Sequence, residues 1–277
     1  MRPAEVLRRG AGYLEGHDVD QPLATAEVLL ASILGTDRTG LYLREEGLSS
    51  AEAKRFGRAL CRRCTGTPVQ HLTGEQGFRR LVLEARPGVF IPRPETEIVV
   101  DVALEAIAGI EAPVVVDVGT GTGAIALSLA LEHPGARVLA TDVAPKALAV
   151  ARVNAERYGL EVDLREGDLL EPVASELRGE IDLVVSNPPY IAPSDVIALP
   201  RDVRADPPRA LVGGIDVYER LFPQALECLR PGGTVVVEVG DDQGETVASA
   251  AAAAGFDDVR VWPDLTWRDR VVWGRRP

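Results

Sequence analysis

Cysteine, histidine and long uncharged runs are all scarce in this sequence of 277 residues. Three cysteines are too few for a disulfide framework, so we expect a protein of the reducing cytoplasm. No stretch of about 18 or more residues is free of charge, and the apolar run at 98–116 contains three acidic residues, which argues against a membrane-spanning helix. With three histidines and one Cys-x-x-Cys pair, Cys61 and Cys64, we expect no metal site.

Basic residues are scarce in the second part of the chain. Residues 1–85 hold 12 basic and 11 acidic residues, a net charge of +1, whereas residues 86–277 hold 18 basic and 31 acidic residues, a net charge of −13. Such an excess of negative charge repels phosphate backbones, so we expect no stable nucleic-acid binding. The content of 46% hydrophobic and 26% charged residues is that of a globular protein and excludes a disordered or fibrous chain.

Residues 1–66 are predicted to form a small helical domain. Ala24–Leu34 carries apolar residues at helical spacing, and Ser49 followed by Glu52 is the capping-box pattern that opens a further helix, to about Cys64. One face of this further helix carries three arginines, Arg55, Arg58 and Arg62. This face is either solvated or a docking face for an acidic or RNA-bound partner.

Residues 67–92 are predicted to be a linker and residues 93–277 a second domain. In the linker, Arg86-Pro87-Gly88 lies between apolar residues and predicts the turn of a β-hairpin. The second domain alternates strand and helix patterns, with strands expected at 114–118, 137–141, 161–165, 181–186, 234–239, 259–261 and 270–273. This alternation predicts an α/β fold with a mostly parallel sheet and helices on both faces.

A glycine-rich loop joins the first of these strands to a helix. Gly119, Gly121 and Gly123 allow a tight turn and let a ligand lie against bare backbone. Either a dinucleotide or S-adenosylmethionine would fit, with Asp142, about twenty residues further on, binding ribose hydroxyls. Asp117 is poorly placed for a pyrophosphate but suits an ammonium or sulfonium group, which favours S-adenosylmethionine.

The fourth strand ends in Asn187-Pro188-Pro189-Tyr190, which should face the ligand of the glycine loop. The Asn187 side-chain oxygen and the Pro188 carbonyl can each accept an N–H from a planar –NH2 group, and Tyr190 can lie on the face of that group. This predicts methyl transfer to an amide or aryl nitrogen. We find no acid–base pair beside this turn, so we expect a pH–rate profile without a bell between about 6 and 9.

Longer motifs resemble a known family. The run DVGTGTGAIALSLA at 117–130 and the tetrapeptide at 187–190 are similar to class I S-adenosylmethionine-dependent amino-methyltransferases. The segments PVQHLTG at 68–74, VFIPRPETE at 89–97 and RDRV at 268–271 resemble, more narrowly, the release-factor glutamine N5-methyltransferases. The resemblance covers roughly residues 20–275. It implies a Rossmann-like class I sheet, mostly parallel with an antiparallel edge, and a small N-terminal helical domain joined by a β-hairpin.

The resemblance also implies an activity and its residues. The activity is methylation of the glutamine side-chain amide in the Gly-Gly-Gln motif of peptide-chain release factors, which supports translation termination. The implied cofactor-binding residues are Gly119, Thr120, Gly121, Thr122 and Gly123 for the methionine part, Asp142 for the ribose, Asp168 and Leu169 beside the adenine, and Asn187. Asn187, Pro188, Pro189 and Tyr190 would hold the glutamine, with Asn187, Pro188 and Tyr190 catalytic, and Phe90 and Ile91–Thr96 would wall the site.

Two other functions remain open. Enzymes that methylate adenine N6 or guanine N2 in nucleic acids share the Asn-Pro-Pro-Tyr motif, although no basic target-recognition insert is visible here. An inactive methyltransferase fold that serves as an interaction module would be expected to lose Asn187 or the glycines, and this chain keeps them. We expect a monomer whose partner is a release factor and which has no contact with a membrane.

Overall fold

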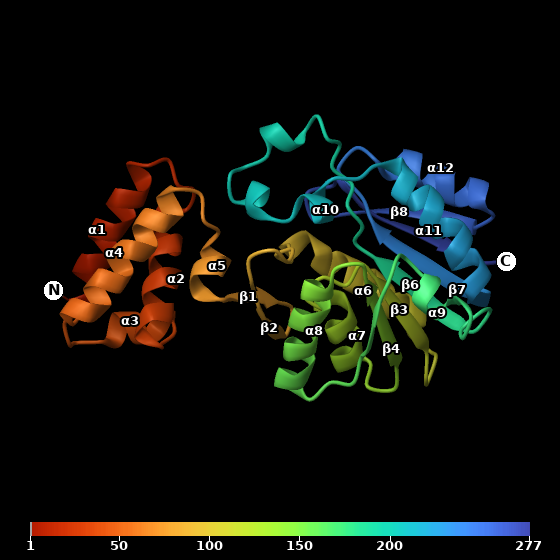
Figure 1. Ribbon diagram of the computed structural model, residues 1–277, viewed down its shortest axis with the longest axis horizontal. Helices are drawn as coiled ribbons and strands as arrows, with labels where there is room; N and C mark the ends of the chain where they lie inside the picture. The colour runs from red at the N-terminus through yellow and green to blue at the C-terminus, as the bar shows by residue number, and fades with distance from the viewer. Residues whose placement is uncertain (1) are drawn as a thin grey trace. The chain divides into compact units, whose positions relative to one another are not determined.

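The computed structural model describes residues 2–277, which form two compact units (Figure 1). The first unit comprises the chain up to Glu75 together with Leu199–Ala205, and the second comprises Gln76–Ala198 and Asp206–Pro277. Crossing a bilayer requires a long, apolar helix, and none of the helices between residues 2 and 277 meets that requirement.

The first unit is helical, as predicted. Its elements are α1 (Pro3–Glu15), α2 (Pro22–Leu34), α3 (Arg38–Leu43), α4 (Ser50–Cys64) and α5 (Val69–Thr73). The helices pack around buried apolar side chains such as Leu7, Leu30 and Phe56. The capping box is confirmed, because the Ser49 hydroxyl accepts from the Glu52 N–H and the Glu52 carboxylate accepts from the Ser49 N–H, at 3.3 and 2.6 Å.

The second unit contains a seven-stranded sheet. Its strands are β3 (Val114–Val118), β4 (Arg137–Asp142), β5 (Asp163–Glu166), β6 (Ile181–Ser186), β7 (Leu229–Glu238), β8 (Asp257–Pro263) and β9 (Asp269–Arg275). Their order across the sheet is β5-β4-β3-β6-β7-β9-β8. The first five in this order are parallel, and β9 runs antiparallel to both β7 and β8. The mostly parallel, Rossmann-like sheet with an antiparallel edge is therefore confirmed.

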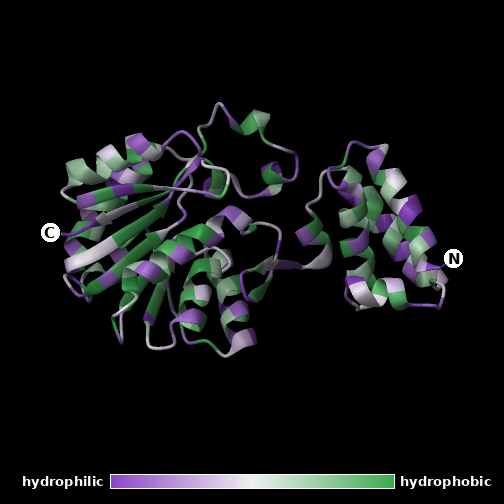
Figure 2. Ribbon diagram, turned by 180° about the vertical axis from the view of Figure 1, so that it is seen from behind, coloured by the Kyte–Doolittle hydropathy of each residue, from purple (hydrophilic) through white to green (hydrophobic). Residues whose placement is uncertain are grey.

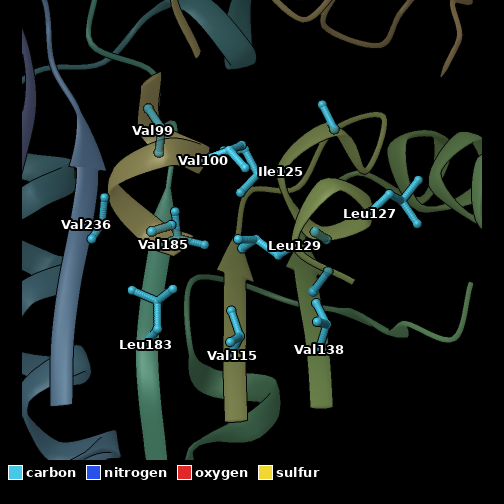
Figure 3. Close-up of a cluster of buried hydrophobic side chains, with 14 of the residues drawn as sticks. Val99, Val100, Val115, Ile125, Leu127, Leu129, Val138, Leu183, Val185 and Val236 are labelled. Atoms are coloured by element: carbon cyan, nitrogen blue, oxygen red, sulfur yellow. The ribbon is translucent and has the colours of Figure 1, made fainter. Parts of the chain in front are cut away.

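Helices cover both faces of this sheet. One face packs against α6 (Glu97–Ile107), α7 (Ala124–Glu132) and α8 (Pro145–Tyr158), around a core that includes Val115, Leu183 and Val236 (Figure 3). The other face packs against α9 (Glu171–Ala174), α11 (Ile215–Cys228) and α12 (Gly244–Ala254). Because both faces are buried, the central strands are mostly apolar, and green stretches mark them in Figure 2.

The position of the hairpin turn was predicted wrongly. The hairpin pairs β1 (Glu75–Phe78) with β2 (Leu81–Glu84), so its turn is Arg79-Arg80 rather than Arg86–Gly88. Arg79 has a φ of 50°, and its guanidinium binds Glu132 and Asp101 at 2.6 Å each. These contacts fix the turn, and they cannot be read from local sequence. Gly88, with a φ of 90°, forms a separate turn in which the Val89 N–H donates to the Arg86 carbonyl.

Other differences from the sequence-based expectation concern element boundaries. The strand expected at 161–165 runs from Asp163 to Glu166, and the one expected at 234–239 already begins at Leu229. Helix α11 was not predicted. It contains Pro223, a residue that argues against a helix when only local propensity is considered, yet its buried face includes Tyr218 and Phe222.

Candidate active site

The loops that carry the predicted site residues lie at one edge of the sheet. In the parallel register, Val118 of β3 is level with Thr141 of β4 and with Ser186 of β6. Ser186 is in turn level with Val237 of β7. The residues that follow these strands are therefore brought to the same edge, which is where open α/β sheets bind ligands.

The glycine loop is held against β4 and is open on its other side. The N–H groups of Gly119 and Thr120 both donate to the Thr141 carbonyl, at 2.8 and 3.0 Å. Gly119 and Gly121 have φ values of 74° and 58°, and a Cβ atom added at either would meet no atom within 4 Å. Gly123 differs, because a Cβ there would approach Leu127 to 3.0 Å. Gly119 and Gly121 thus leave open space above bare backbone, whereas Gly123 serves helix packing.

Asp117 lies beneath this loop and is 1% exposed. Its Oδ2 atom accepts from the Thr120 hydroxyl at 2.6 Å and from the Ala126 N–H at 3.1 Å. Its Oδ1 atom is buried and has no hydrogen-bond partner among residues 2–277. Burial raises the pKa of Asp117 to about 7, although the two hydrogen bonds oppose the shift. An unpaired, buried carboxylate oxygen fits a cationic ligand, which would favour the ionised form.

Asp142 shapes the loop from the end of β4. One carboxylate oxygen accepts from the Gly121 N–H at 2.9 Å, and the other accepts from the Ala144 N–H at 2.8 Å. Burial raises its pKa, and these two hydrogen bonds oppose the rise. The structure therefore joins Asp142 directly to the glycine loop, the other part of the predicted cofactor site.

Asp168 and Leu169 follow β5. The Leu169 carbonyl accepts from the Thr141 hydroxyl at 2.7 Å, and Leu169 has a φ of 49°, an unusual value for a branched side chain. Asp168 forms an ion pair with Arg220 of α11. Thr141 thus connects the Leu169 backbone to the glycine loop, whereas the Asp168 side chain pairs with α11.

Asn187 is held by Thr96, the residue before α6. The Asn187 Nδ2 donates to the Thr96 hydroxyl oxygen at 3.0 Å, and Thr96 is 3% exposed. The segment Ile91–Thr96 is anchored in turn by Asp206, whose carboxylate accepts from the Ile91 N–H at 3.2 Å and pairs with Arg93. The Arg93 guanidinium lies 5.3 Å from the centre of the Phe90 ring. The segment predicted to wall the site therefore contacts the Asn-Pro-Pro-Tyr turn directly.

The end of the Asn-Pro-Pro-Tyr turn is fixed by contacts that sequence reasoning missed. The Tyr190 carbonyl accepts from the Gln243 Nε2 at 2.9 Å, and the Tyr190 hydroxyl donates to Glu238 at 3.2 Å. A Cβ added at Gly213 would lie 1.9 Å from the Pro189 carbonyl oxygen, so only glycine permits this approach. A signal for Glu238 exists in the sequence, because Glu238-Val239-Gly240 follows a run of valines and repeats the pattern of Asp117-Val118-Gly119, an acid, a valine and a glycine.

The parallel sheet, the glycine loop over a buried carboxylate and the Asn-Pro-Pro-Tyr turn define a methyltransferase of the Rossmann-like class. Residues 5–74 match the model of the PrmC N-terminal domain, and residues 80–201 match that of the methyltransferase small domain. A relative named release factor glutamine methyltransferase, from Moorella thermoacetica, is 45% identical over 100% of this chain and 99% of its own length. The chain belongs to the release factor glutamine methyltransferase family.

A second relative agrees with this assignment, and a solved structure agrees with the fold. A relative of the same name from Deinococcus radiodurans is 41% identical over 100% of this chain and 99% of its own length. Among solved structures, the 16S rRNA N2 methyltransferase of T. thermophilus, in complex with AdoMet and guanosine, has a TM-score of 0.55. It is 20% identical and covers 73% of this chain and 50% of its own, a likeness that concerns the fold alone.

The buried carboxyl of Asp117 predicts a pH-dependent stability. Its pKa in the folded chain, about 7, lies above the ordinary value of 3.8, so folding retains a proton that unfolding releases between these pH values. The group therefore makes the folded state lose stability as pH rises from about 4 to about 7. Asp117→Asn removes this titration. Relative to the parent, its free energy of unfolding should increase across the window by up to ~1.4 kcal/mol per pH unit.

The measurement is urea unfolding of the ligand-free chain at several pH values, followed by tryptophan fluorescence. All three tryptophans, Trp262, Trp267 and Trp273, lie in the second unit, so the signal reports on the unit that contains Asp117. A difference between variant and parent that stays constant from pH 4 to 7 would contradict the raised pKa.

Proposed function

We propose that this chain transfers a methyl group from S-adenosylmethionine to the side-chain amide nitrogen, N5, of the glutamine in the Gly-Gly-Gln motif of release factors. The observation that carries the proposal is the match along the whole chain to relatives named for this activity, at 45% and 41% identity. The Asn-Pro-Pro-Tyr turn supports it, because it offers hydrogen-bond acceptors for an amide –NH2 group. Release factors act on ribosomes, so we further propose a cytoplasmic enzyme. We also propose that the enzyme is a monomer.

The residues proposed to hold S-adenosylmethionine are those of the glycine loop and its supports, namely Gly119, Thr120, Gly121, Thr122, Gly123, Asp142, Asp168, Leu169 and Asn187. When bound, this cofactor supplies an electrophilic methyl group on a sulfonium. The open backbone at Gly119 and Gly121 and the unpaired Oδ1 atom of Asp117 support a cationic ligand here. The carboxylate of Asp142 can still accept hydrogen bonds from ribose hydroxyls, since each of its oxygens has a single hydrogen-bond partner within residues 2–277.

The proposed substrate residues are Asn187, Pro188, Pro189 and Tyr190. The Asn187 Nδ2 is engaged by Thr96, which leaves its Oδ1 as the atom that accepts an N–H from the glutamine amide. The Pro188 carbonyl accepts the second N–H. With both protons held, the nitrogen lone pair, which is normally delocalised into the carbonyl, is directed toward the methyl donor. The rate would then come mainly from in-line positioning. The N–CH3 bond would form as the S–CH3 bond of the donor breaks, and one N–H proton would afterwards pass to solvent.

The experiment that tests this function offers labelled S-adenosylmethionine together with intact release factor, DNA or RNA in parallel reactions. We expect label on the release factor, on the glutamine of the Gly-Gly-Gln motif as located by peptide mass spectrometry. The net charge of −13 on residues 86–277 argues against a nucleic-acid substrate. Label on adenine N6 or guanine N2, with none on the release factor, would overturn the proposal in favour of a nucleic-acid methyltransferase.

Replacement of Asn187 tests the proposed mechanism. Asn187→Ala removes the acceptor for the substrate amide, and we expect turnover to fall by about 10²-fold or more, the scale of one lost transition-state contact. Ser194→Ala is the matched control in the same loop, because Ser194 is exposed and its hydroxyl donates to its neighbour Asp195. Near-normal turnover of Asn187→Ala, with both variants folded, would remove the basis for this role.

We further propose a division of labour in which residues 1–66 dock the release factor, residues 67–92 link the domains and residues 93–277 carry out methyl transfer. A single glutamine side chain has too few atoms for selectivity, so recognition must extend to the protein that carries it. The face of α4 with Arg55, Arg58 and Arg62 is a suitable docking surface, because all three arginines are exposed. These arginines offer positive charge to an acidic partner surface.

Charge reversal on α4 tests the docking surface. The combined variant Arg55→Glu, Arg58→Glu and Arg62→Glu should raise KM for the intact release factor by about tenfold or more at low salt, and less at high salt. Activity on a short Gly-Gly-Gln peptide should not change. The matched control reverses three exposed charges of the second unit, Lys146→Glu, Arg152→Glu and Arg178→Glu. Equal losses on factor and peptide, or equal losses in the control, would show that α4 is not the docking surface.

A further inference from the structure

Glu238 is a buried acid beside the Asn-Pro-Pro-Tyr turn. It is the last residue of β7 and is 1% exposed. Its neighbour Val237 is level with Ser186 of β6, so Glu238 reaches the sheet edge level with Asn187. Side chains alternate along a strand, so Glu238 lies on the face of Val236, the face covered by α6. That helix begins directly after Thr96, the residue that holds Asn187.

The carboxyl of Glu238 contacts Tyr190 of the turn and lies beside Thr96, the residue that holds Asn187. The Tyr190 hydroxyl donates to its Oε1 atom at 3.2 Å. The Thr96 hydroxyl, which accepts from the Asn187 Nδ2 at 3.0 Å, lies close enough to this carboxyl to lower its pKa. The other carboxylate oxygen of Glu238, Oε2, is buried and has no hydrogen-bond partner among the described residues. The Glu238 backbone is fixed as well, because its carbonyl accepts from the Tyr218 hydroxyl at 2.8 Å. Glu238 is thus the shared partner of the two chains of contacts that lead to Asn187 and Tyr190.

The direction of these hydrogen bonds depends on the charge of Glu238. An ionised carboxylate can only accept, so in a hydrogen bond between Thr96 and the unpartnered Oε2 atom of Glu238 the Thr96 hydroxyl is the donor. The Thr96 oxygen is then an acceptor toward Asn187, which places the Asn187 –NH2 group against Thr96 and leaves Oδ1 facing the site. A protonated Glu238 can instead donate to Thr96, and Thr96 is then free to donate to Asn187. Asn187 would turn over and present –NH2 to a substrate that also offers –NH2.

We propose that Glu238, in its ionised form, is a positioning residue that orients the Asn187 amide through Thr96 and the Tyr190 ring through its hydroxyl. This inference rests on the proposed methyl transfer to an amide. Glu238 itself touches neither substrate nor cofactor in this scheme. Its effect is to make Asn187 present an acceptor rather than a donor, which is the property that the substrate amide requires.

Ionisation of Glu238 falls in the physiological range because several groups face it. Its pKa is raised to about 7, mainly by burial and to a smaller extent by the nearby carboxylate of Glu95. The nearby hydroxyls of Thr96 and Tyr190 and the positive charge of Arg270 lower it. The Arg270 guanidinium is itself held by Asp241 and Asp264, at 2.6 and 3.2 Å. A titrating group therefore lies beside the turn, and we expect a single acidic limb with a midpoint near pH 7, which remains a profile without a bell.

The kinetic test uses three substitutions and single-turnover rates between pH 6 and 8.5. Glu238→Gln, which cannot ionise, should lower the rate at pH 8 by about 10- to 100-fold, the scale of a misplaced reacting group, and should abolish the acidic limb. Thr96→Val should cause a comparable loss. Thr96→Ser keeps the hydroxyl and should restore most of the activity. KM for the intact release factor should change little, because docking is assigned to residues 1–66.

A matched control and a double variant separate positioning from general damage. Thr234→Val removes a buried hydroxyl from the same strand, β7, that has no hydrogen-bond partner among the described residues, and should leave the rate unchanged. The double variant Thr96→Val with Glu238→Gln should lose no more activity than the worse single variant, since both act through one network. Losses that multiply, or an acidic limb that persists in Glu238→Gln, would overturn the inference.

A measurement without substrate distinguishes this inference from the proposed function. The side-chain amide resonances of Asn187, one of two asparagines in the chain, should shift with pH in the parent with a midpoint near 7 and should not shift in Glu238→Gln. A parent that methylates release factor but shows no such titration would refute the role of Glu238 alone. A parent with the titration but without activity on release factor would refute the proposed function and leave the orientation of Asn187 by Glu238 in place.

Discussion

The parallel pairing of β3 with β6 is the constraint on which the rest of the second unit depends. Val118 and Ser186 are level in this pairing, although they are 68 positions apart in the sequence. The glycine loop, which follows Val118, and the Asn-Pro-Pro-Tyr turn, which follows Ser186, therefore begin side by side. A hydrogen bond from the Ser186 hydroxyl to the Val118 carbonyl, at 2.7 Å, locks the two strand ends together. A shift of one residue in this register would reverse the face of every side chain on the strand.

The same sheet edge carries two buried acids, Asp117 and Glu238, at or next to the ends of strands β3 and β7. Each has a pKa raised to about 7 by burial, because a carboxylate loses hydration when it leaves water. Both are therefore poised between the neutral and the ionised form. The groups around each acid decide what ionisation does. Asp117 contacts the loop that approaches the proposed cofactor, whereas Glu238 contacts the side chains that approach the proposed substrate.

Local patterns in the sequence predicted much of the fold but only part of the site. The valine-rich strands, the capping box at Ser49 and the glycine loop are each encoded by a few neighbouring residues, and the structure has them where expected. The contact between Asn187 and Thr96 spans 91 positions and that between Tyr190 and Glu238 spans 48, so no local pattern reveals them. The hairpin turn was misplaced for the same reason, since Arg79 is fixed by Glu132, a residue of α7.

The dependence on distant contacts also explains why the Asn-Pro-Pro-Tyr turn is not a self-sufficient reactive element. Its prolines stiffen the backbone and leave carbonyls as acceptors, but they cannot decide which end of the Asn187 amide faces outward. The two ends are nearly equal in shape, so the choice must come from a group with a fixed preference for accepting hydrogen bonds. An ionised carboxylate is such a group, and Glu238 lies one hydroxyl away from Asn187. The chemistry of the turn thus depends on an acid placed by the neighbouring strand.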